Sequence, residues 1–184
     1  YPRILQKEKR LEIDTVRTFI KDKLDVTDKD IDLLESAGGM TNKNYKVILN
    51  GQSFIVRIAG NGTDRFIDRT AEKENSIIAQ ILGLDVETTY FDAETGTKIS
   101  QFITGAETLN PVTAAYPKNM ELTTNLLRKL HHSGLEFSNE FNVFREIEKY
   151  EHLADEMAAT YYEGYQVLRP LVLSLEKDLL KMGI

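Results

Sequence analysis

Hydrophobic and polar positions follow three successive patterns along the chain. Residues 9–24 place Val16 and Ile20 at helical spacing, which predicts an amphipathic helix. From about 31 to 103, apolar runs are short or alternate with polar residues, as is typical of strands. From about 118 onward, apolar residues recur at the spacing of helices. Strands followed by helices predict an α+β fold with two lobes.

The strand region contains a strong hairpin signal. Asn50-Gly51 separates the β-rich run 45–49 from the alternating segment 52–59, and this dipeptide favours the tight turn between antiparallel strands. One helix is predicted around 77–82, where apolar residues return to helical spacing. A further strand pair is predicted within 89–103.

The last part of the chain predicts a set of helices. A leucine stripe marks 118–130, a charged amphipathic pattern marks 142–158, and a second apolar stripe marks 168–179. Pro170 falls near the start of this last helix, where proline is tolerated. The expected organisation is an N-lobe, a hinge and crossover, and a partial helical C-lobe: 1–103, 104–117 and 118–184.

Composition and charge exclude several classes of protein. The 184 residues carry a net charge of −6, which argues against a protein that grips a nucleic-acid backbone. The absence of Cys excludes disulfides and thiolate metal sites. No apolar run is long enough to span a membrane and no signal peptide is recognisable, so we expect a cytoplasmic protein without membrane insertion. The first residue is Tyr rather than Met, which indicates a chain cut from a longer protein.

The segment Gly38-Gly39-Met40-Thr41-Asn42-Lys43 is the first candidate for binding chemistry. Its two glycines allow positive φ and let a ligand approach backbone N–H groups, and Lys43 adds positive charge near a phosphate. The pattern is not that of a P-loop, because the spacing of that motif is missing. The alternative is a polar hairpin turn without a ligand.

Arg57 interrupts an otherwise apolar strand, and a partly buried cation needs a partner. Glu74 in the following helix is the candidate partner, with Glu72 competing for the role. A glycine loop, a strand cation and a helix acid follow one another in the same order in a kinase N-lobe, where the cation holds nucleotide phosphates. The alternatives are an edge-strand charge facing solvent and a solvated first helical turn.

Three further groups of residues have structural explanations. His131 and His132 lie at a helix end and lack the spacing and third partner of a metal site, so no metal ligand is expected among them. The acidic positions within 146–156 fit a solvated helix face, and the tyrosines within 161–165 fit packing between helices. The alternative for both sets is attraction of a quaternary ammonium ion.

The glycine loop, the Arg57 strand and the start of the following helix, together with three later segments, resemble the bacterial choline/ethanolamine kinase family. This family is the LicA-like branch of the aminoglycoside-phosphotransferase and protein-kinase-like superfamily. The resemblance extends almost continuously from about Leu33 to the end of the chain. The segments that carry it are 38–45, 54–58, 72–75, 99–103, 127–131 and 139–144.

The resemblance implies an ATP site in this chain. The loop would cover the ATP phosphates, Arg57 would contact them and Glu74 would orient Arg57. The backbone of Gln101-Phe102-Ile103 would form the hinge that binds adenine. The candidate binding residues are therefore Gly38, Gly39, Met40, Thr41, Asn42, Lys43, Arg57, Glu74, Gln101, Phe102 and Ile103. The parent enzyme would use MgATP to phosphorylate the hydroxyl of choline or ethanolamine.

The sequence departs from the family in one respect. The family's catalytic loop, His-x-Asp-x-x-x-x-Asn, is absent, because no His in the chain has Asp two positions later. The catalytic base and the Mg²⁺ ligands are therefore expected beyond Ile184, and the chain alone is expected to be inactive and to self-associate through an uncovered apolar face. The alternatives are a non-catalytic nucleotide-binding or interaction module, and a kinase for another small alcohol such as an aminoglycoside.

Overall fold

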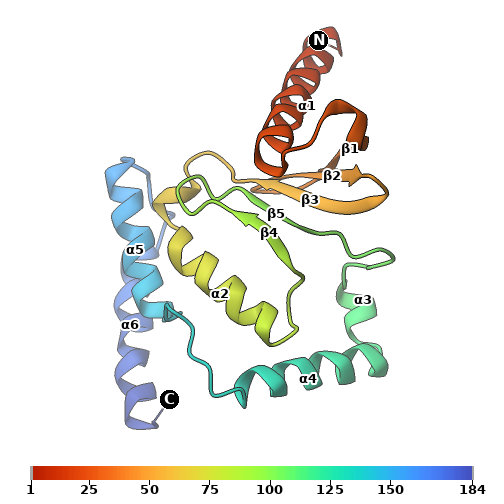
Figure 1. The fold of residues 1–184 in the computed structure, drawn as a ribbon. Helices are drawn as coiled ribbons and strands as arrows, with labels where there is room; N and C mark the ends of the chain where they lie inside the picture. The colour runs from red at the N-terminus through yellow and green to blue at the C-terminus, as the bar shows by residue number, and fades with distance from the viewer. Residues whose placement is uncertain (1, 184) are drawn as a thin grey trace. The chain divides into compact units, whose positions relative to one another are not determined.

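The computed structural model describes residues 2–183, and side chains from Glu12 onward (Figure 1). The strands are β1 (Ile31–Gly38), β2 (Lys43–Leu49), β3 (Gln52–Ile58), β4 (Thr88–Phe91) and β5 (Lys98–Gln101). The helices are α1 (Pro2–Leu24), α2 (Arg69–Ile81), α3 (Pro111–Ala114), α4 (Pro117–His131), α5 (Val143–Glu156) and α6 (Tyr165–Lys181), with 3₁₀ turns η1 (Asp28–Asp30) and η2 (Thr63–Arg65). In this part of the chain, no helix is both long and apolar enough to cross a membrane.

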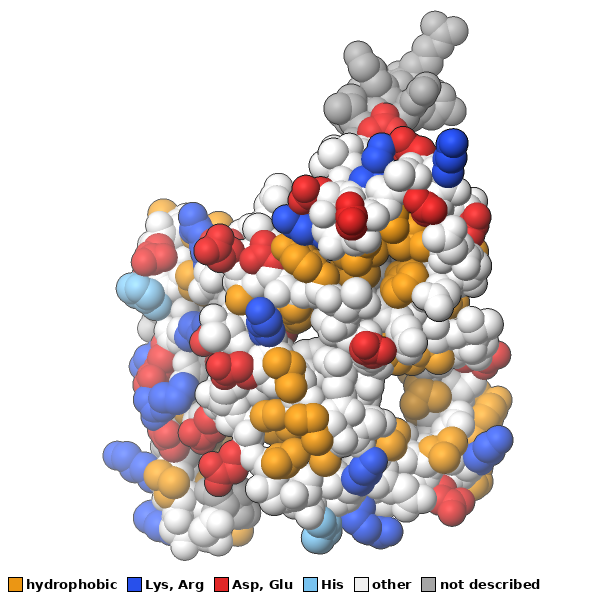
Figure 2. Space-filling view, in the orientation of Figure 1, with side chains coloured by type: hydrophobic (Ala, Val, Ile, Leu, Met, Phe, Trp, Pro, Cys, Tyr) orange, Lys and Arg blue, Asp and Glu red, His pale blue; other side chains and the backbone are white. Residues whose placement is uncertain are grey.

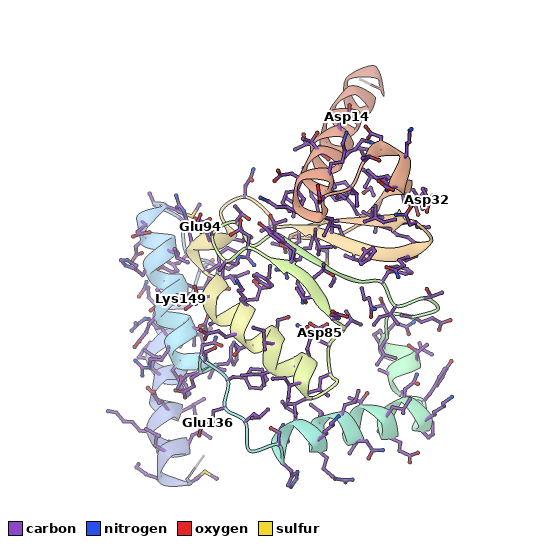
Figure 3. All side chains as sticks on the ribbon, viewed as in Figure 1. Asp14, Asp32, Asp85, Glu94, Glu136 and Lys149 are labelled. Atoms are coloured by element: carbon purple, nitrogen blue, oxygen red, sulfur yellow. The ribbon has the colours of Figure 1, made fainter. Side chains whose placement is uncertain are left out.

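The strands form one antiparallel sheet in the order β1-β2-β3-β5-β4, so the predicted α+β class is confirmed. The predicted hairpin at Asn50-Gly51 is also confirmed. Leu49 pairs with Gln52, and the two turn residues have φ values of 48° and 78°, as a tight turn of this kind requires. The Gly51 N–H donates a 2.8 Å hydrogen bond to the side chain of Asp32 (labelled in Figure 3). This bond joins the β2–β3 turn to β1.

The core lies between α1 and one face of the sheet. Because side chains alternate along a strand, Val47, Val56 and Ile99 share this face, and Val16 and Ile20 of α1 pack against them. Figure 1 shows α2 on the opposite side of the sheet from α1. Side chains on the second face of β3 and β5 therefore point toward α2, and these include the polar residues of the candidate site.

The chain divides into two compact units, one ending at Ser138 and one beginning at Asn139. This division falls later than the predicted crossover at 104–117, so α3 and α4 belong to the unit that contains the sheet. One reason is local: the Asn75 side chain of α2 accepts hydrogen bonds of 2.9 and 3.0 Å from the N–H and hydroxyl of Ser138. These bonds fix the segment after α4 to α2.

Two details of the helices differ from expectation. The crossover contains the short helix α3, which begins with an Asn110 cap and Pro111 at its first position, a start signal that the apolar pattern did not reveal. The last helix begins at Tyr165, so Pro170 lies inside it rather than in its first turn. Pro170 has no N–H to donate to the carbonyl of Gln166, and one helical hydrogen bond is therefore missing.

Candidate functional site

The glycine loop between β1 and β2 folds tightly on itself. Gly38 and Gly39 have φ values of 82° and 139°, and a Cβ on Gly39 would lie 1.9 Å from the carbonyl oxygen of Asn42. Gly60, which follows β3, packs as closely, since a Cβ there would lie 2.0 Å from the carbonyl oxygen of Thr41. The Gly60 N–H also donates a 3.3 Å hydrogen bond to the Asn42 side chain. The loop is thus closed against the end of β3, and side chains at positions 39 and 60 are sterically excluded.

The tip and the end of the loop differ in what they contact. Met40 is fully exposed at the tip. Lys43 forms an ion pair with Glu12 of α1, and this hydrogen bond raises the pKa of the Lys43 ammonium group. Lys43 is therefore charged but directed toward α1 in this structure. Its contact with phosphate stays a prediction.

Arg57 lies on β3, in the middle of the sheet, and only 20% of its side chain is exposed. The alternative of an edge-strand charge facing solvent is therefore wrong. Its Nη1 lies 2.6 Å from Oε1 of Glu72, and its Nη2 donates a 3.1 Å hydrogen bond to the carbonyl oxygen of Gly96. The guanidinium carbon lies 5.6 Å from the centre of the Phe91 ring. Arg57 is held on three sides in a partly buried position.

The partner of Arg57 is Glu72, so the expectation that Glu74 forms this pair is wrong. Both residues belong to the first turns of α2, but positions two apart on an α-helix point in nearly opposite directions. Glu72 faces the sheet with 26% of its side chain exposed, whereas Glu74 is exposed to solvent. The sequence offered both candidates, and only the rotation of α2 against β3 distinguishes them.

Arg69 is a site residue that the sequence analysis missed. It is 6% exposed, and its Nη1 lies 2.6 Å from the second oxygen of Glu72. Glu72 thus accepts hydrogen bonds from two guanidinium groups, one on each carboxylate oxygen. The signal that would have revealed it is the i, i+3 spacing of Arg69 and Glu72 at a helix start.

The two arginines set the protonation state of Glu72. Burial alone would raise the pKa of this carboxyl, but the hydrogen bonds from Arg69 and Arg57 outweigh it, and the pKa is lowered from the ordinary value. Glu72 is therefore a carboxylate at neutral pH. The cluster Arg57–Glu72–Arg69 carries one net positive charge.

The predicted hinge follows β5 directly. The N–H of Gln101 donates to the carbonyl oxygen of Glu87 and the N–H of Phe102 donates to that of Ser53, each at 3.0 Å. The Lys46 ammonium lies 4.6 Å from the centre of the Phe102 ring. An open hollow of about 720 Å³ lies beside these residues, with polar groups of the β2–β3 turn in its lining.

The remaining candidates pack as structural groups. Tyr161 stacks on Tyr165 with ring centres 4.7 Å apart, and their hydroxyls donate to Asp155 at 2.9 Å and to Glu151 at 2.8 Å. Burial, followed by the hydrogen bond to Asp155, raises the pKa of Tyr161 to about 12. Tyr161 and Tyr165 therefore pack as predicted. Glu151 does not fit the predicted solvated helix face, because only 13% of its side chain is exposed and it is bound by Tyr165 and Arg169. Over the described residues, no group of three His, Asp or Glu side chains is placed to hold a metal ion.

The sheet, the glycine loop between its first two strands and the Arg–Glu pair between β3 and α2 define the N-lobe fold of the protein-kinase-like superfamily. No protein-family model matches the chain. The curated protein LicA of Haemophilus influenzae is 33% identical over 126 residues, which are 68% of this chain and 37% of that protein.

Solved structures agree with this relationship. Choline kinase LicA from Streptococcus pneumoniae aligns with a TM-score of 0.77 and 34% identity, over 92% of this chain and 57% of that one. A structure of LicA in complex with AMP gives a TM-score of 0.74 and 34% identity, over 91% and 58%. The chain belongs to the LicA-like choline/ethanolamine kinase family. It spans 37% of the length of the curated relative and somewhat more than half of the solved chains.

Proposed function

We propose that the protein containing this chain transfers the γ-phosphoryl group of ATP to the hydroxyl group of choline or ethanolamine. The observation that carries the proposal is the Arg57–Glu72 pair, which joins β3 to α2 at the end of the sheet where the glycine loop closes. A relative described as choline kinase LicA supports the choice of acceptor, and a structure of LicA in complex with AMP supports an adenine nucleotide.

In the proposal, Arg57 and the loop 38–43 hold the ATP phosphates. A guanidinium group stays charged at any physiological pH and presents several N–H donors to phosphate oxygens. Gly39 lets the loop fold against the carbonyl group of Asn42, which holds the loop backbone in one conformation. Glu72, rather than Glu74, keeps Arg57 in place, as the helix acid does for the strand cation of kinases.

In the proposal, adenine binds at the hinge 101–103. The structure limits which backbone N–H groups of the hinge can donate to the base. The N–H groups of Gln101 and Phe102 already donate to Glu87 and Ser53. A backbone N–H donor for the base would therefore come from Ile103 or the residues after it. The Phe102 ring would add an apolar surface, with Lys46 on one of its faces.

Mg²⁺ and the catalytic base are not assigned to the described residues. None of these residues form a carboxylate cluster suited to Mg²⁺, and the chain contains no His-x-Asp motif. In the proposal, other residues of the complete protein supply both groups.

The test is a phosphorylation assay of the complete protein, with choline, ethanolamine and an aminoglycoside offered separately with MgATP. Phosphorylation of choline or ethanolamine, with a kcat/KM at least about tenfold above that for the aminoglycoside, supports the proposal. Selective phosphorylation of the aminoglycoside would replace the acceptor. Nucleotide binding without phosphorylation of any acceptor would favour a non-catalytic binding module.

A further inference from the structure

Glu72 is shared between two arginines that come from different elements. Arg57 reaches it from β3, and Arg69 reaches it from the first residue of α2. Arg69 is the more deeply buried of the two, with 6% of its side chain exposed against 20% for Arg57. The proposed function gives Arg57 and Glu72 a role, but it leaves the buried Arg69 without one.

Arg69 is fixed by contacts on both sides of its guanidinium group. Its Nη2 donates a 2.5 Å hydrogen bond to the Thr63 hydroxyl, and that hydroxyl donates a 2.8 Å bond to the carbonyl oxygen of Gly60. Gly60 is the residue that packs against Thr41 of the glycine loop. A continuous set of contacts therefore runs from Glu72 through Arg69 to the loop.

The turn between β4 and β5 makes room for this arginine. A Cβ on Gly96 would lie 2.6 Å from Nε and 2.8 Å from Cζ of Arg69, so the guanidinium group occupies the space of a side chain. Figure 3 shows this turn, marked by Glu94, beside the start of α2. The carbonyl oxygen of Gly96 also accepts the hydrogen bond from Arg57. Gly96 thus contacts both arginines: its missing side chain leaves space for Arg69, and its carbonyl oxygen accepts a hydrogen bond from Arg57.

We propose that Arg69 is a positioning residue for the phosphate contact of Arg57. It occupies one oxygen of Glu72, so that this carboxylate pairs with Arg57 through its other oxygen only. This inference rests on the proposed function and deepens it.

Two physical consequences distinguish this arrangement from a simple ion pair. A carboxylate with both oxygens free tends to bind an arginine with two parallel hydrogen bonds, which would turn the donors of Arg57 away from a ligand. In addition, an isolated Arg57–Glu72 pair is neutral, whereas the cluster with Arg69 keeps one net positive charge. A site that attracts phosphates benefits from that charge.

The first experiment is Arg69→Met in the complete protein, with Arg65→Met as the matched control. Arg65 is an exposed arginine in η2, four residues earlier. We expect Arg69→Met to raise the KM for ATP at least about tenfold, because a charge-assisted hydrogen bond is lost, and to leave the KM for the acceptor nearly unchanged. Arg69→Lys, which keeps the charge, should recover part of the loss. Equal kinetics for Arg69→Met and Arg65→Met would overturn the inference.

A double-mutant cycle tests whether Arg69 acts through Glu72. If it does, adding Arg69→Met to Glu72→Gln has little further effect on the KM for ATP, whereas independent roles would multiply the two effects.

Gly96→Ala provides a variant that keeps every charge. It should reproduce the effect of Arg69→Met, whereas Gly51→Ala should not, since Gly51 has a similar φ of 78° but no heavy atom within 4 Å of a Cβ. A Gly96→Ala protein that binds ATP as tightly as the Gly51→Ala protein would contradict the seating of Arg69.

Binding of a fluorescent ATP analogue, measured without any acceptor, separates this inference from the proposed function. Loss of analogue binding in Arg69→Met supports the inference whichever acceptor the enzyme uses. Wild-type phosphorylation of choline together with unchanged analogue binding in Arg69→Met would leave the proposed function intact and remove the inference.

Discussion

The sheet region and the helices that follow it bury their apolar side chains to very different degrees. Among the described residues, every buried core side chain except Phe144 comes before Gln101. By contrast, α6 exposes 70% of Val167, 61% of Leu171 and 54% of Leu175. The exceptions in the first region are Met40 in the glycine loop and two residues of α2, Ile77 and Ile81, and apolar side chains reach the surface near α2 in Figure 2. The sheet with α1 is a closed core, whereas the later helices form apolar faces without a comparable core.

The buried core of the sheet region contributes most to the stability of the chain, whereas the exposed faces of the later helices are open to further packing. Ile20 of α1 packs against Val47 and Ile99 of the sheet, and this contact removes nearly all of their surface from water. Val167, Leu171 and Leu175 on α6 contribute much less to the free energy of folding, because more than half of the surface of each side chain stays in contact with solvent. The two regions should therefore respond differently to the same substitution.

The largest effect is expected from Ile99→Ala in the 184-residue chain. This substitution leaves a cavity between α1 and the sheet and should lower the free energy of unfolding by about 2–5 kcal/mol. Leu171→Ala is the matched change on α6 and should cost less than about 0.5 kcal/mol. Urea unfolding followed by circular dichroism measures both. Equal losses would remove the contrast between the two regions.

Arg57→Ala should weaken ATP binding by about tenfold to a hundredfold, because charge-assisted hydrogen bonds to phosphate are lost. The fold should change little, since Glu72 keeps its contact with Arg69. Titration calorimetry with the complete protein gives the affinity, and Arg17→Ala on α1 is the control. Unchanged nucleotide affinity in Arg57→Ala would refute its phosphate role.

Glu72→Gln should lower phosphoryl transfer by about tenfold, through a less firmly held Arg57. Glu74→Gln should leave the rate nearly unchanged, because this side chain is exposed and two positions away on α2. Steady-state rates of the complete protein compare the two variants. A larger loss in Glu74→Gln would restore the original assignment of the helix acid.

The lowered pKa of Glu72 also predicts a pH dependence of stability. A carboxyl whose pKa is lower in the folded state stabilises the fold above its unfolded pKa of about 4.3, and this contribution is lost as the pH falls through the lower, folded value. Glu72→Gln should therefore lose stability at neutral pH and show a weaker decline on acidification. Melting temperatures between about pH 6 and pH 3 measure this, with Glu74→Gln expected to follow the wild type.

The smallest effect is weak self-association of the 184-residue chain through the exposed apolar faces of its later helices. Sedimentation velocity should show an average mass that rises with concentration, and Leu171→Glu should reduce the rise. A mass independent of concentration would show that these faces do not drive association.

The fold was predictable where local chemistry determines it. Residue type predicted the Asn50-Gly51 turn. The spacing of apolar residues predicted the alternation in β2 and β3 and the helices from Pro117 onward. The short helix α3 was missed because its start depends on capping by Asn110 and not on an apolar period.

The site was predictable in its parts but not in their pairing. The strand position of Arg57 made a partner necessary, yet the choice between Glu72 and Glu74 depends on the rotation of α2 against the sheet. The role of Arg69 depends on a glycine 27 positions later, at Gly96, which no local pattern connects to it. Such pairings are properties of tertiary packing, and a single sequence does not contain a direct signal for them.

The strand order β1-β2-β3-β5-β4 has a consequence for how the protein forms. Apart from the pairing of β3 with β5, which brings Arg57 beside Lys98, all neighbours in the sheet are consecutive along the chain. Contacts between nearby segments form quickly because little loop entropy is lost in making them. The sheet can therefore assemble during synthesis, before the last helices, α5 and α6, have emerged from the ribosome. The sheet and α1 would then be folded before the helices that follow them along the chain.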